Sequence, residues 1–214
     1  GLRALAERVH RHDCRIAAQL NHSGKVSAYD VVEGRQILVP SIPKPAANDM
    51  GNGLTMAEMA NFVRAAGPDG KGPRFKEMDQ ADIDWVIECF ASAAKRVAKA
   101  GFDAVEIHAG HGYLLSSFLS PYANRREDEY GGELANRARL LLQVVDAIKL
   151  AVGDDFPIMV RLDACEYRTE GGIKLDDAVQ VSQWLDKAGC HAINVSAYSN
   201  NSAIGFTEGP LVHQ

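Results

Sequence analysis

The sequence has few cysteines, no basic run and no long apolar run, and each shortage excludes a class of protein. Its cysteines are scattered and form no CxxC pair, so the sequence indicates neither a zinc site nor an iron–sulfur cluster. We expect free thiols in a reducing compartment, and a cytoplasmic protein by default because the sequence shows neither a membrane span nor a signal peptide. No apolar run is long enough to cross a membrane, and residues 1–13 predict an amphipathic helix rather than a signal peptide. The cysteines are Cys14, Cys89, Cys165 and Cys190.

Charge is nearly balanced, with a small acidic excess. Lys and Arg number 23 and Asp and Glu number 28, which gives a formal net charge of -5. Because nucleic-acid-binding domains carry clustered positive charge, this balance disfavours nucleic acid as a partner. Hydrophobic residues make up 46% of the 214 residues, enough for the core of one globular domain. We expect a small-molecule substrate and no membrane or nucleic-acid partner, and we leave homo-oligomer formation open.

Helices and strands are predicted to alternate along the chain with short connections. Apolar residues at helical spacing predict helices over about 2–12, 80–99, 133–151 and 175–188. Short apolar stretches predict strands over 15–20, 104–108, 157–162 and 192–197. This alternation is typical of an α/β fold with a parallel sheet. A (β/α)8 TIM barrel has eight strands in ~250 residues, so we expect these strands to be the incomplete central portion of such a barrel.

Residues 21–78 are rich in Pro, Gly and Asn, and we expect them to form a long irregular loop inserted within the domain. Such a loop inside a compact domain is usually functional or mobile. We expect it to shape access of the substrate. Asp79, directly after this range, is placed to cap the helix over 80–99.

One face of the predicted strands is polar. Strands of parallel sheets are usually apolar on both faces. Polar side chains toward the C-terminal ends of all four strands therefore indicate a ligand bound in the mouth of a barrel. The polar face carries Gln19, Glu106, His108, Arg161, Asp163, Asn194 and Ser196. The face suited to covering helices carries Ile16, Ala18, Leu20, Val105, Ile107, Ile158, Val160, Leu162, Ile193 and Val195.

The most specific motif of the chain includes the strand over 104–108. EIHAGHGYLLSSFLSP is followed by NRREDEYGGELANRARLL. These stretches resemble the Old Yellow Enzyme family, the NADH:flavin oxidoreductases that include 2,4-dienoyl-CoA reductases and bile-acid enone reductases. The resemblance extends over essentially the whole chain. It implies that 1–214 is a partial FMN-binding TIM-barrel domain, about the third to sixth strands, without the first two and last two barrel strands.

The resemblance implies an FMN-dependent oxidoreductase of the ene-reductase type. NADH or NADPH would reduce the flavin, and hydride would pass to an electron-poor alkene such as an enone or an enoyl or dienoyl thioester. An iron–sulfur cluster and FAD would belong only to later domains of multidomain relatives. Two alternatives stay open. One is a catalytically inactive barrel fragment, because the FMN phosphate is expected at the last two strands; the other is a non-flavin barrel enzyme that uses a histidine pair for metal binding or proton transfer.

Arg161 and Gln19 are candidate cofactor-binding residues near strand ends. A guanidinium is rarely buried without a partner, so Arg161 either faces an anionic or electron-rich group or pairs with Glu106 on the neighbouring strand. The resemblance places Arg161 against the N1/O2 edge of the flavin, where a fixed cation stabilises the negative charge of the reduced ring. The Gln19 amide both donates and accepts hydrogen bonds, which matches the pyrimidine edge of a flavin.

His22 and Lys25 are the other two candidates for cofactor binding. Gln19, His22 and Gly24 meet the QLxHxG pattern of the family. Lys25 stands where many relatives have Arg, which keeps the charge but loses the forked geometry. The side chains of His22 and Lys25 either contact cofactor or substrate or belong to a solvated loop.

His108, His111 and Tyr113 are the candidate catalytic residues, because three groups that can donate a proton lie close to one strand end. Histidines three apart can share a metal ion, but Gly110 and Gly112 disfavour a regular helix and no third ligand is evident. We favour two donors that converge on a substrate carbonyl oxygen, where negative charge develops as hydride arrives. The resemblance assigns Tyr113 the protonation of the α-carbon, which a phenol protonated at neutral pH can perform. The alternative is a tyrosine packed under the loop.

The segment over 124–132, NRREDEYGG, is rich in charge, and we interpret it as structural. Its arginines and carboxylates are expected to form a local ion-pair network that fixes the loop. Its two glycines allow the turn into the next helix.

Overall fold

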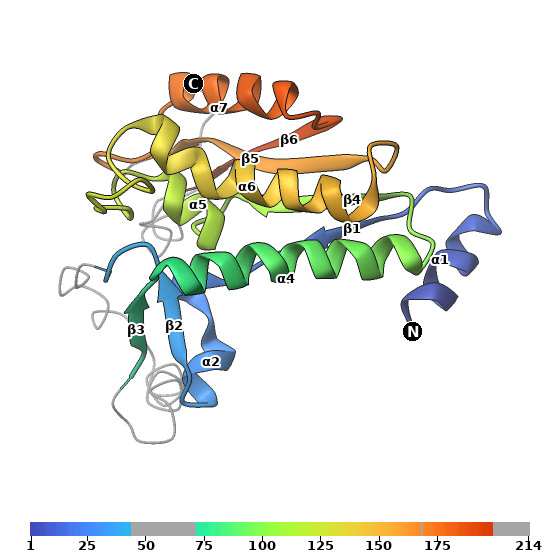
Figure 1. The fold of residues 1–214 in the computed structure, drawn as a ribbon, viewed down its shortest axis with the longest axis horizontal. Helices are drawn as coiled ribbons and strands as arrows, with labels where there is room; N and C mark the ends of the chain where they lie inside the picture. Colours follow the sequence, from blue (N-terminus) through green and yellow to red (C-terminus); the bar gives the residue numbers. More distant parts are fainter. Residues whose placement is uncertain (44–71, 168, 199–214) are drawn as a thin grey trace, which may run out of the picture.

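Four parallel strands form the centre of the structure. The computed structural model describes residues 1–43, 72–167 and 169–198 (Figure 1). The strand order in the sheet is β1-β4-β5-β6, so the strands of this sheet lie side by side in the order in which they occur in the chain. This confirms the predicted strands. Their bounds are β1 Ala17–Leu20, β4 Ala104–Ala109, β5 Ile158–Glu166 and β6 Ala192–Tyr198.

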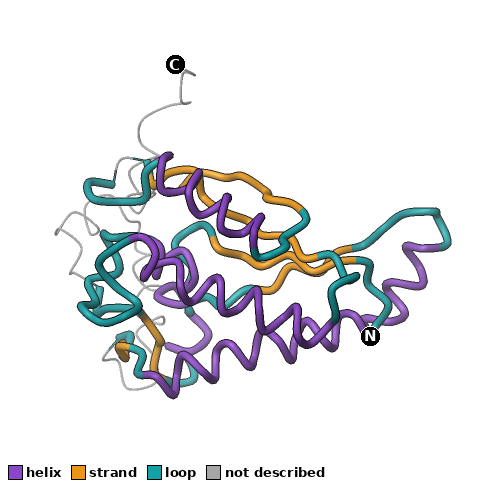
Figure 2. The backbone as a smooth tube through the Cα atoms, turned by 45° about the horizontal axis from the view of Figure 1, so that its top comes forward, coloured by secondary structure: helices purple, strands orange, loops and turns teal. Residues whose placement is uncertain are grey.

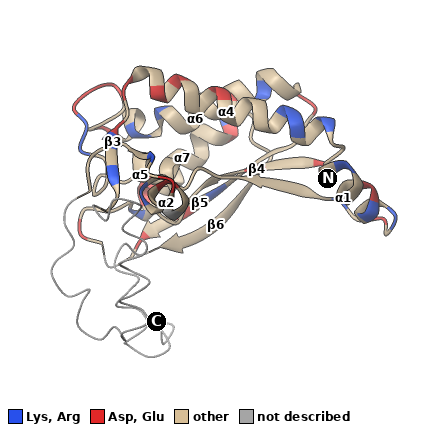
Figure 3. Ribbon diagram, turned by 90° about the horizontal axis from the view of Figure 1, so that it is seen from below, with Lys and Arg blue, Asp and Glu red and all other residues tan. Residues whose placement is uncertain are grey.

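Long helices connect these strands and lie on one side of the sheet, as Figures 2 and 3 show. Each connection is a strand–helix–strand crossover, the repeating unit of a (β/α)8 barrel. No helix of the described ranges has both the length and the apolar character needed to cross a membrane. The helices α1 Leu2–His10, α4 Gln80–Lys99, α6 Leu134–Val152 and α7 Leu175–Lys187 confirm the four that the apolar spacing predicted.

α4 begins and ends where its sequence predicts. The Asp79 carboxylate accepts a hydrogen bond from the Asp82 backbone N–H at 3.0 Å, and the Asp82 carboxylate accepts one from the Asp79 N–H at 3.0 Å. This reciprocal pair satisfies N–H groups that the start of a helix leaves without partners. The chain turns away from the helix at Gly101, whose φ is +87°. A side chain would be strained in that left-handed conformation.

The core lies between the sheet and its helices. Ile107 on β4 and Leu140 on α6 are both 0% exposed. The outer face of β4 and β5 is apolar and buried, as predicted. Val195 on β6 differs, because it is 68% exposed. It lines an open groove together with Leu175 and Val179 of α7, and no other described helix covers it there.

The range 21–78 is not a single irregular loop in its described parts. Two strands, β2 and β3, pair in parallel apart from the main sheet, and Ile37 and Val39 of β2 are each 1% exposed. The expectation of one irregular loop is thus corrected at its two ends, while residues 44–71 lie outside the described residues. The elements are η1 Gly24–Val26, α2 Ala28–Val32, β2 Gln36–Val39 and β3 Arg74–Glu77.

The charged segment over 124–132 makes structural contacts, but among the described residues the expected ion-pair network is reduced to one ion pair, and hydrogen bonds to backbone carbonyls take the place of the others. Arg126 Nη2 forms an ion pair with Asp128 at 2.5 Å. Arg126 Nη1 donates to the carbonyl oxygens of Met78 at 2.7 Å and Pro40 at 3.2 Å. A Cβ at Gly131 would lie only 2.0 Å from the Arg126 carbonyl oxygen, so glycine is required there. The loop therefore joins the segments that precede α4 and follow β2.

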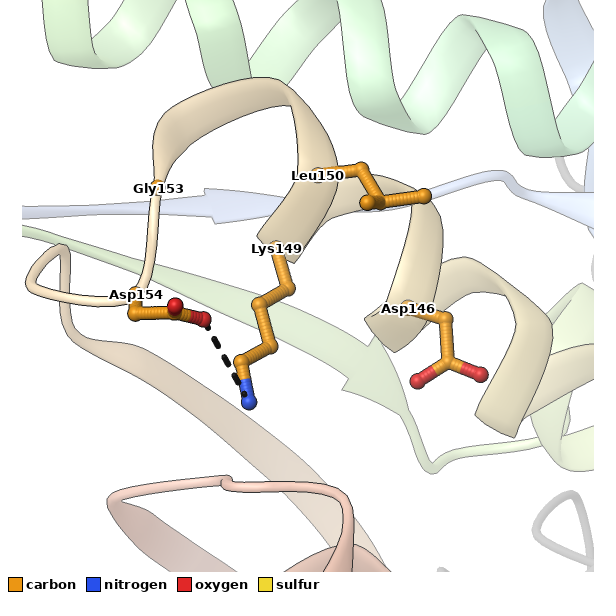
Figure 4. A pocket seen from close by; sticks show the side chains of 5 residues that line it. All are labelled: Asp146, Lys149, Leu150, Gly153 and Asp154. Carbon is orange, nitrogen blue, oxygen red and sulfur yellow. Dashed lines mark ion pairs between the residues drawn. The ribbon is translucent and has the colours of Figure 1, made fainter.

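We expect Leu140→Ala to lower the free energy of unfolding by about 2–5 kcal/mol, because it empties a fully buried position. Leu150→Ala, the same substitution in the same helix, is the matched control. Leu150 is 89% exposed and lines an open pocket with Lys149 and Asp154 (Figure 4). Its replacement should change the free energy of unfolding by less than about 0.5 kcal/mol. Urea-induced unfolding measures both values, and equal losses would contradict this placement of the core.

Candidate active site

Three ring side chains meet at the C-terminal end of β4. His108 lies on the strand, and His111 and Tyr113 follow in the loop before α5 (Leu114–Leu119), a helix that the sequence did not predict. The ring centroid of His108 lies 4.9 Å from that of His111 and 4.9 Å from that of Tyr113. His108 is buried, whereas the other two are partly exposed. The structure thus brings the three candidate catalytic residues together at a place that a ligand can reach.

The loop between β4 and α5 is a tight turn with little free space. His111 has φ +58° and Gly112 has φ +68°, both in the left-handed region. A Cβ at Gly112 would lie 2.7 Å from the ring of Tyr198, and one at Gly110 would lie 2.8 Å from the Asp163 carboxylate. A side chain at either position would force the neighbouring side chain to move, and at 112 it would also strain the backbone.

His108 is held as a neutral hydrogen-bond donor. Its Nδ1 accepts a hydrogen bond from the Gly110 backbone N–H at 3.1 Å, so the proton of the neutral ring is on Nε2. Burial lowers the pKa of His108, and nearby His111 and Arg161 lower it further, against the opposite effect of two carboxylates. A neutral imidazole with a proton on Nε2 can donate to a substrate oxygen.

Arg161 lies beside His108 on the polar face of the sheet. In the strand pairing, His108 is opposite Arg161 and Arg161 is opposite Asn194. Arg161 Nε donates to the Ser196 hydroxyl at 3.5 Å, and its guanidinium forms no ion pair with any residue that the structure describes. The alternative expected from the sequence, an ion pair between Arg161 and Glu106, is therefore wrong.

Glu106 accepts hydrogen bonds from neutral donors instead. Gln19 Nε2 donates to one oxygen of its carboxylate at 2.5 Å, and Asn194 Nδ2 donates to the other at 3.1 Å. Gln19 lies directly opposite Glu106 in the pairing of β1 with β4, and its side chain is exposed. The Gln19 amide and the Arg161 guanidinium thus share one face of the sheet, open to a ligand.

The loop after β1 docks on the start of α5. The Leu114 backbone N–H donates to the His22 carbonyl oxygen at 3.0 Å, and the Gly24 N–H donates to His22 Nδ1 at 3.1 Å. Gly24 has φ +53°, and a Cβ there would lie 2.9 Å from the Leu114 nitrogen. Burial lowers the pKa of His22 and that of Lys25. Both side chains are partly buried, which argues against a fully solvated loop.

Asp163 and Tyr198 are residues of this site to which the sequence assigned no role. Asp163 is buried beneath the loop that carries His111. The ring centroid of Tyr198 is 6.3 Å from that of His111, and burial together with nearby carboxylates raises the pKa of Tyr198. A signal for Tyr198 was present, because it continues the alternation of Asn194 and Ser196 on the polar face of β6.

The two histidines do not belong to a metal-binding cluster within the described ranges. No group of three or more His, Cys, Asp or Glu side chains is placed there to hold a metal ion. A catalytic zinc site uses three protein ligands, which the pair alone does not supply.

Comparisons with known proteins find a matching family model and relatives of similar sequence. A sequence model of the NADH:flavin oxidoreductase / NADH oxidase family matches residues 1–206. An NADPH dehydrogenase from Geobacillus sp. (strain WCH70) is 37% identical over 197 residues, which are 92% of this chain and 49% of that protein. An NADH oxidase from Thermoanaerobacter brockii is 37% identical over 197 residues, 92% of this chain and 27% of that protein. The chain therefore spans about half, or less, of the length of these relatives.

Solved structures show the same fold. The old yellow enzyme homologue from Zymomonas mobilis superposes with a TM-score of 0.71 at 27% identity, over 92% of this chain and 51% of that one. Morphinone reductase in complex with tetrahydroNAD superposes with a TM-score of 0.67 at 30% identity, over 90% of this chain and 52% of that one. The expected fold, part of a (β/α)8 TIM barrel, is confirmed.

We expect Gly24→Ala to destabilise the protein more than Gly171→Ala does. Both glycines have positive φ, +53° and +71°, so each substitution carries the cost of a left-handed residue, about 1–2 kcal/mol. Only Gly24 also approaches another element, since nothing lies within 4 Å of a Cβ at Gly171. Urea-induced unfolding measures the difference, and amide hydrogen exchange at Leu114 reports on the docked loop. If both variants lose the same free energy of unfolding and the exchange rate at Leu114 does not change, the loop after β1 does not dock on α5.

Acidification is expected to destabilise the fold through His22 and His108. Burial lowers the pKa of each in the folded protein, whereas an unfolded histidine titrates near ~6.5. The unfolded state therefore binds more protons as the pH falls below about 6.5, and the free energy of unfolding decreases toward the lower folded pKa. Urea-induced unfolding from about pH 8 to about pH 5 measures this slope. His22→Gln should reduce the slope, and an unchanged slope would assign it to other groups.

Proposed function

Because the chain belongs to the NADH:flavin oxidoreductase / NADH oxidase family, we propose that it forms the central part of an FMN-dependent ene-reductase. Its domain is a partial TIM barrel over 1–214 with an insertion over 21–78. The substrate is an electron-poor alkene, an enone or an enoyl or dienoyl thioester, and NADH or NADPH is the reductant. The observation that carries this proposal is the cluster of His108, His111 and Tyr113 beside Arg161, a cation with no ionic partner among the described residues.

The residues at the C-terminal edge of the sheet fit a flavin. Arg161 supplies a fixed cation for a ring that becomes negatively charged on reduction, and Gln19 supplies an amide that both donates and accepts. Both side chains lie on the same open face. His22 and Lys25, in the loop after β1, are the further residues that we assign to cofactor binding. When bound, FMN supplies the hydride transfer, for which proteins depend on a cofactor.

His108 and His111 hold the carbonyl oxygen of the substrate in this proposal. Negative charge develops on that oxygen when the β-carbon takes up hydride, and donors that are already in place stabilise it. His108 donates through Nε2, because its Nδ1 already accepts the Gly110 N–H. Its lowered pKa keeps it neutral at physiological pH, so it does not depend on uptake of a proton beforehand.

Tyr113 delivers a proton to the α-carbon. Its ring centroid lies 4.9 Å from that of His108, so a substrate held by the histidines lies next to the phenol. The proton from Tyr113 and the hydride together account for the two hydrogens that saturate the alkene. The Tyr113 side chain is partly exposed, and this fits the alternative, a tyrosine packed under the loop, less well.

The absorption spectrum of the purified protein, after incubation with FMN and desalting, tests the cofactor assignment. We expect retained visible flavin absorption that bleaches with NADH or NADPH in the absence of oxygen. The absorption should return when 2-cyclohexen-1-one is added as the probe enone. A colourless protein would contradict FMN binding by this chain, and a bleached protein that the enone leaves unchanged would contradict the substrate class.

Tyr113→Phe should slow the return of flavin absorption by roughly 100-fold or more, since a general acid contributes about 10²–10⁴ in rate. Bleaching by NADH or NADPH should be unaffected, because that step takes no proton from this phenol. Tyr122→Phe is the matched control, because Tyr122 is 38% exposed and lies outside the ring cluster. Equal rates for the two variants would exclude Tyr113 as the proton donor.

A further inference from the structure

Asp163 is a buried carboxylate directly beneath the catalytic loop. It lies on β5, two residues after Arg161, and is 0% exposed. Within the described ranges it forms no ion pair with Lys or Arg. A buried carboxylate is costly unless hydrogen bonds satisfy it, so its donors indicate what it holds in place.

Donors from three elements surround the Asp163 carboxylate. The His111 backbone N–H donates to Oδ2 at 2.6 Å, and the Ser116 hydroxyl of α5 donates to the same oxygen at 3.4 Å. The Ser196 hydroxyl of β6 donates to Oδ1 at 2.8 Å. Gly110 leaves the space that this arrangement requires, because a Cβ there would lie 2.8 Å from Oδ1. One carboxylate thus links β5 to β6, to α5 and to the catalytic loop.

The shortest of these hydrogen bonds comes from a residue with an unfavourable backbone conformation. His111 has φ +58°, which residues with a side chain adopt rarely and keep only when their surroundings enforce it. The imidazole itself is not hydrogen-bonded to the carboxylate, since Nε2 lies 3.8 Å from Oδ1. The contact that links this turn to Asp163 is therefore the one to the backbone N–H, and it adds to the hydrogen bond within the turn from the Tyr113 N–H to the Gly110 carbonyl oxygen, 3.3 Å.

We propose that Asp163 is a positioning residue that holds the His111 backbone in its left-handed turn and thereby keeps the His111 ring beside His108. The effect of Asp163 on catalysis rests on the proposed function, whereas its effect on the His111 backbone does not. Asp163 acts through His111 and has no assigned contact with substrate or cofactor. A charged acceptor suits this task, because hydrogen bonds to a carboxylate are stronger than those to a neutral oxygen.

Amide hydrogen exchange at His111 tests the structural step without any catalytic readout. The wild-type amide should be protected, because its hydrogen bond must open before exchange occurs. Asp163→Ala should raise the exchange rate by roughly 10-fold or more, whereas Asp163→Asn keeps an acceptor oxygen and should retain most of the protection. Ser196→Ala removes a different partner of the same carboxylate and should leave the His111 amide protected. Free exchange at His111 in the wild-type protein would overturn the proposal, even if Asp163→Ala fails to fold.

A double-mutant cycle tests the catalytic step in the FMN-loaded protein, with 2-cyclohexen-1-one as the probe substrate. Asp163→Ala should lower kcat/KM by roughly 10–100-fold, because a small misplacement of a catalytic group is costly. Asp163→Asn should restore most of this loss. In the His111→Ala background, Asp163→Ala should cause no further decrease, since the residue that it positions is absent. The same fold decrease in both backgrounds would indicate a purely structural role and would overturn the proposal.

The two measurements separate this proposal from the function on which it rests. If the protein does not reduce the enone, the proposed function fails, and exchange at His111 still decides whether Asp163 fixes the turn. If the enone is reduced but Asp163→Ala leaves the exchange at His111 unchanged, the positioning proposal fails alone.

Discussion

The parallel pairing of β4 with β5 and of β5 with β6 is the constraint on which the rest of the site depends. It places His108, Arg161 and Asn194 in one row across the sheet, and Asp163 beside Ser196 in the row above. Side chains alternate between the two faces of a strand, so a shift of one residue would turn these polar groups into the apolar layer under the helices. The burial of that layer therefore fixes the register, and the register fixes which polar groups meet.

Close backbone contacts then join the loops at the C-terminal edge. The loop after β1 reaches α5 at Gly24, where a side chain would meet the Leu114 backbone. The loop after β4 passes Tyr198 of β6 at Gly112, again with no room for a side chain. These contacts involve residues from distant parts of the sequence, so each loop conformation depends on the position of its neighbour. His111 and Tyr113 consequently lie in a loop that packing holds in place, whereas His108 lies on β4 itself.

Local sequence predicted the elements whose signals are local. The bounds of α4 follow from Asp79 and from the apolar spacing, and the polar face follows from alternation along each strand. The short strands β2 and β3 were missed, because each acquires its structure by pairing with a segment distant in sequence. The sequence also offered Glu106 as an ion-pair partner of Arg161, because the two side chains face the same side of the sheet. Only the side-chain hydrogen bonds of the structure show that Gln19 and Asn194 donate to Glu106 instead.

Among the described residues, the hydrogen bonds of the polar face leave Arg161 without an ion-pair partner. Two carboxylates share this face with Arg161, and both are occupied by other donors: Glu106 by two side-chain amides, and Asp163 by a backbone N–H and hydroxyl groups. The Ser196 hydroxyl lies between the Asp163 carboxylate and the Arg161 guanidinium, because it donates to the first and accepts from the second. A guanidinium hydrogen-bonded to a hydroxyl keeps the positive potential that a carboxylate at ion-pair distance would largely cancel. The same set of hydrogen bonds therefore keeps the guanidinium out of an ion pair among the described residues and allows a buried carboxylate, two residues away, to bind the loop that carries His111.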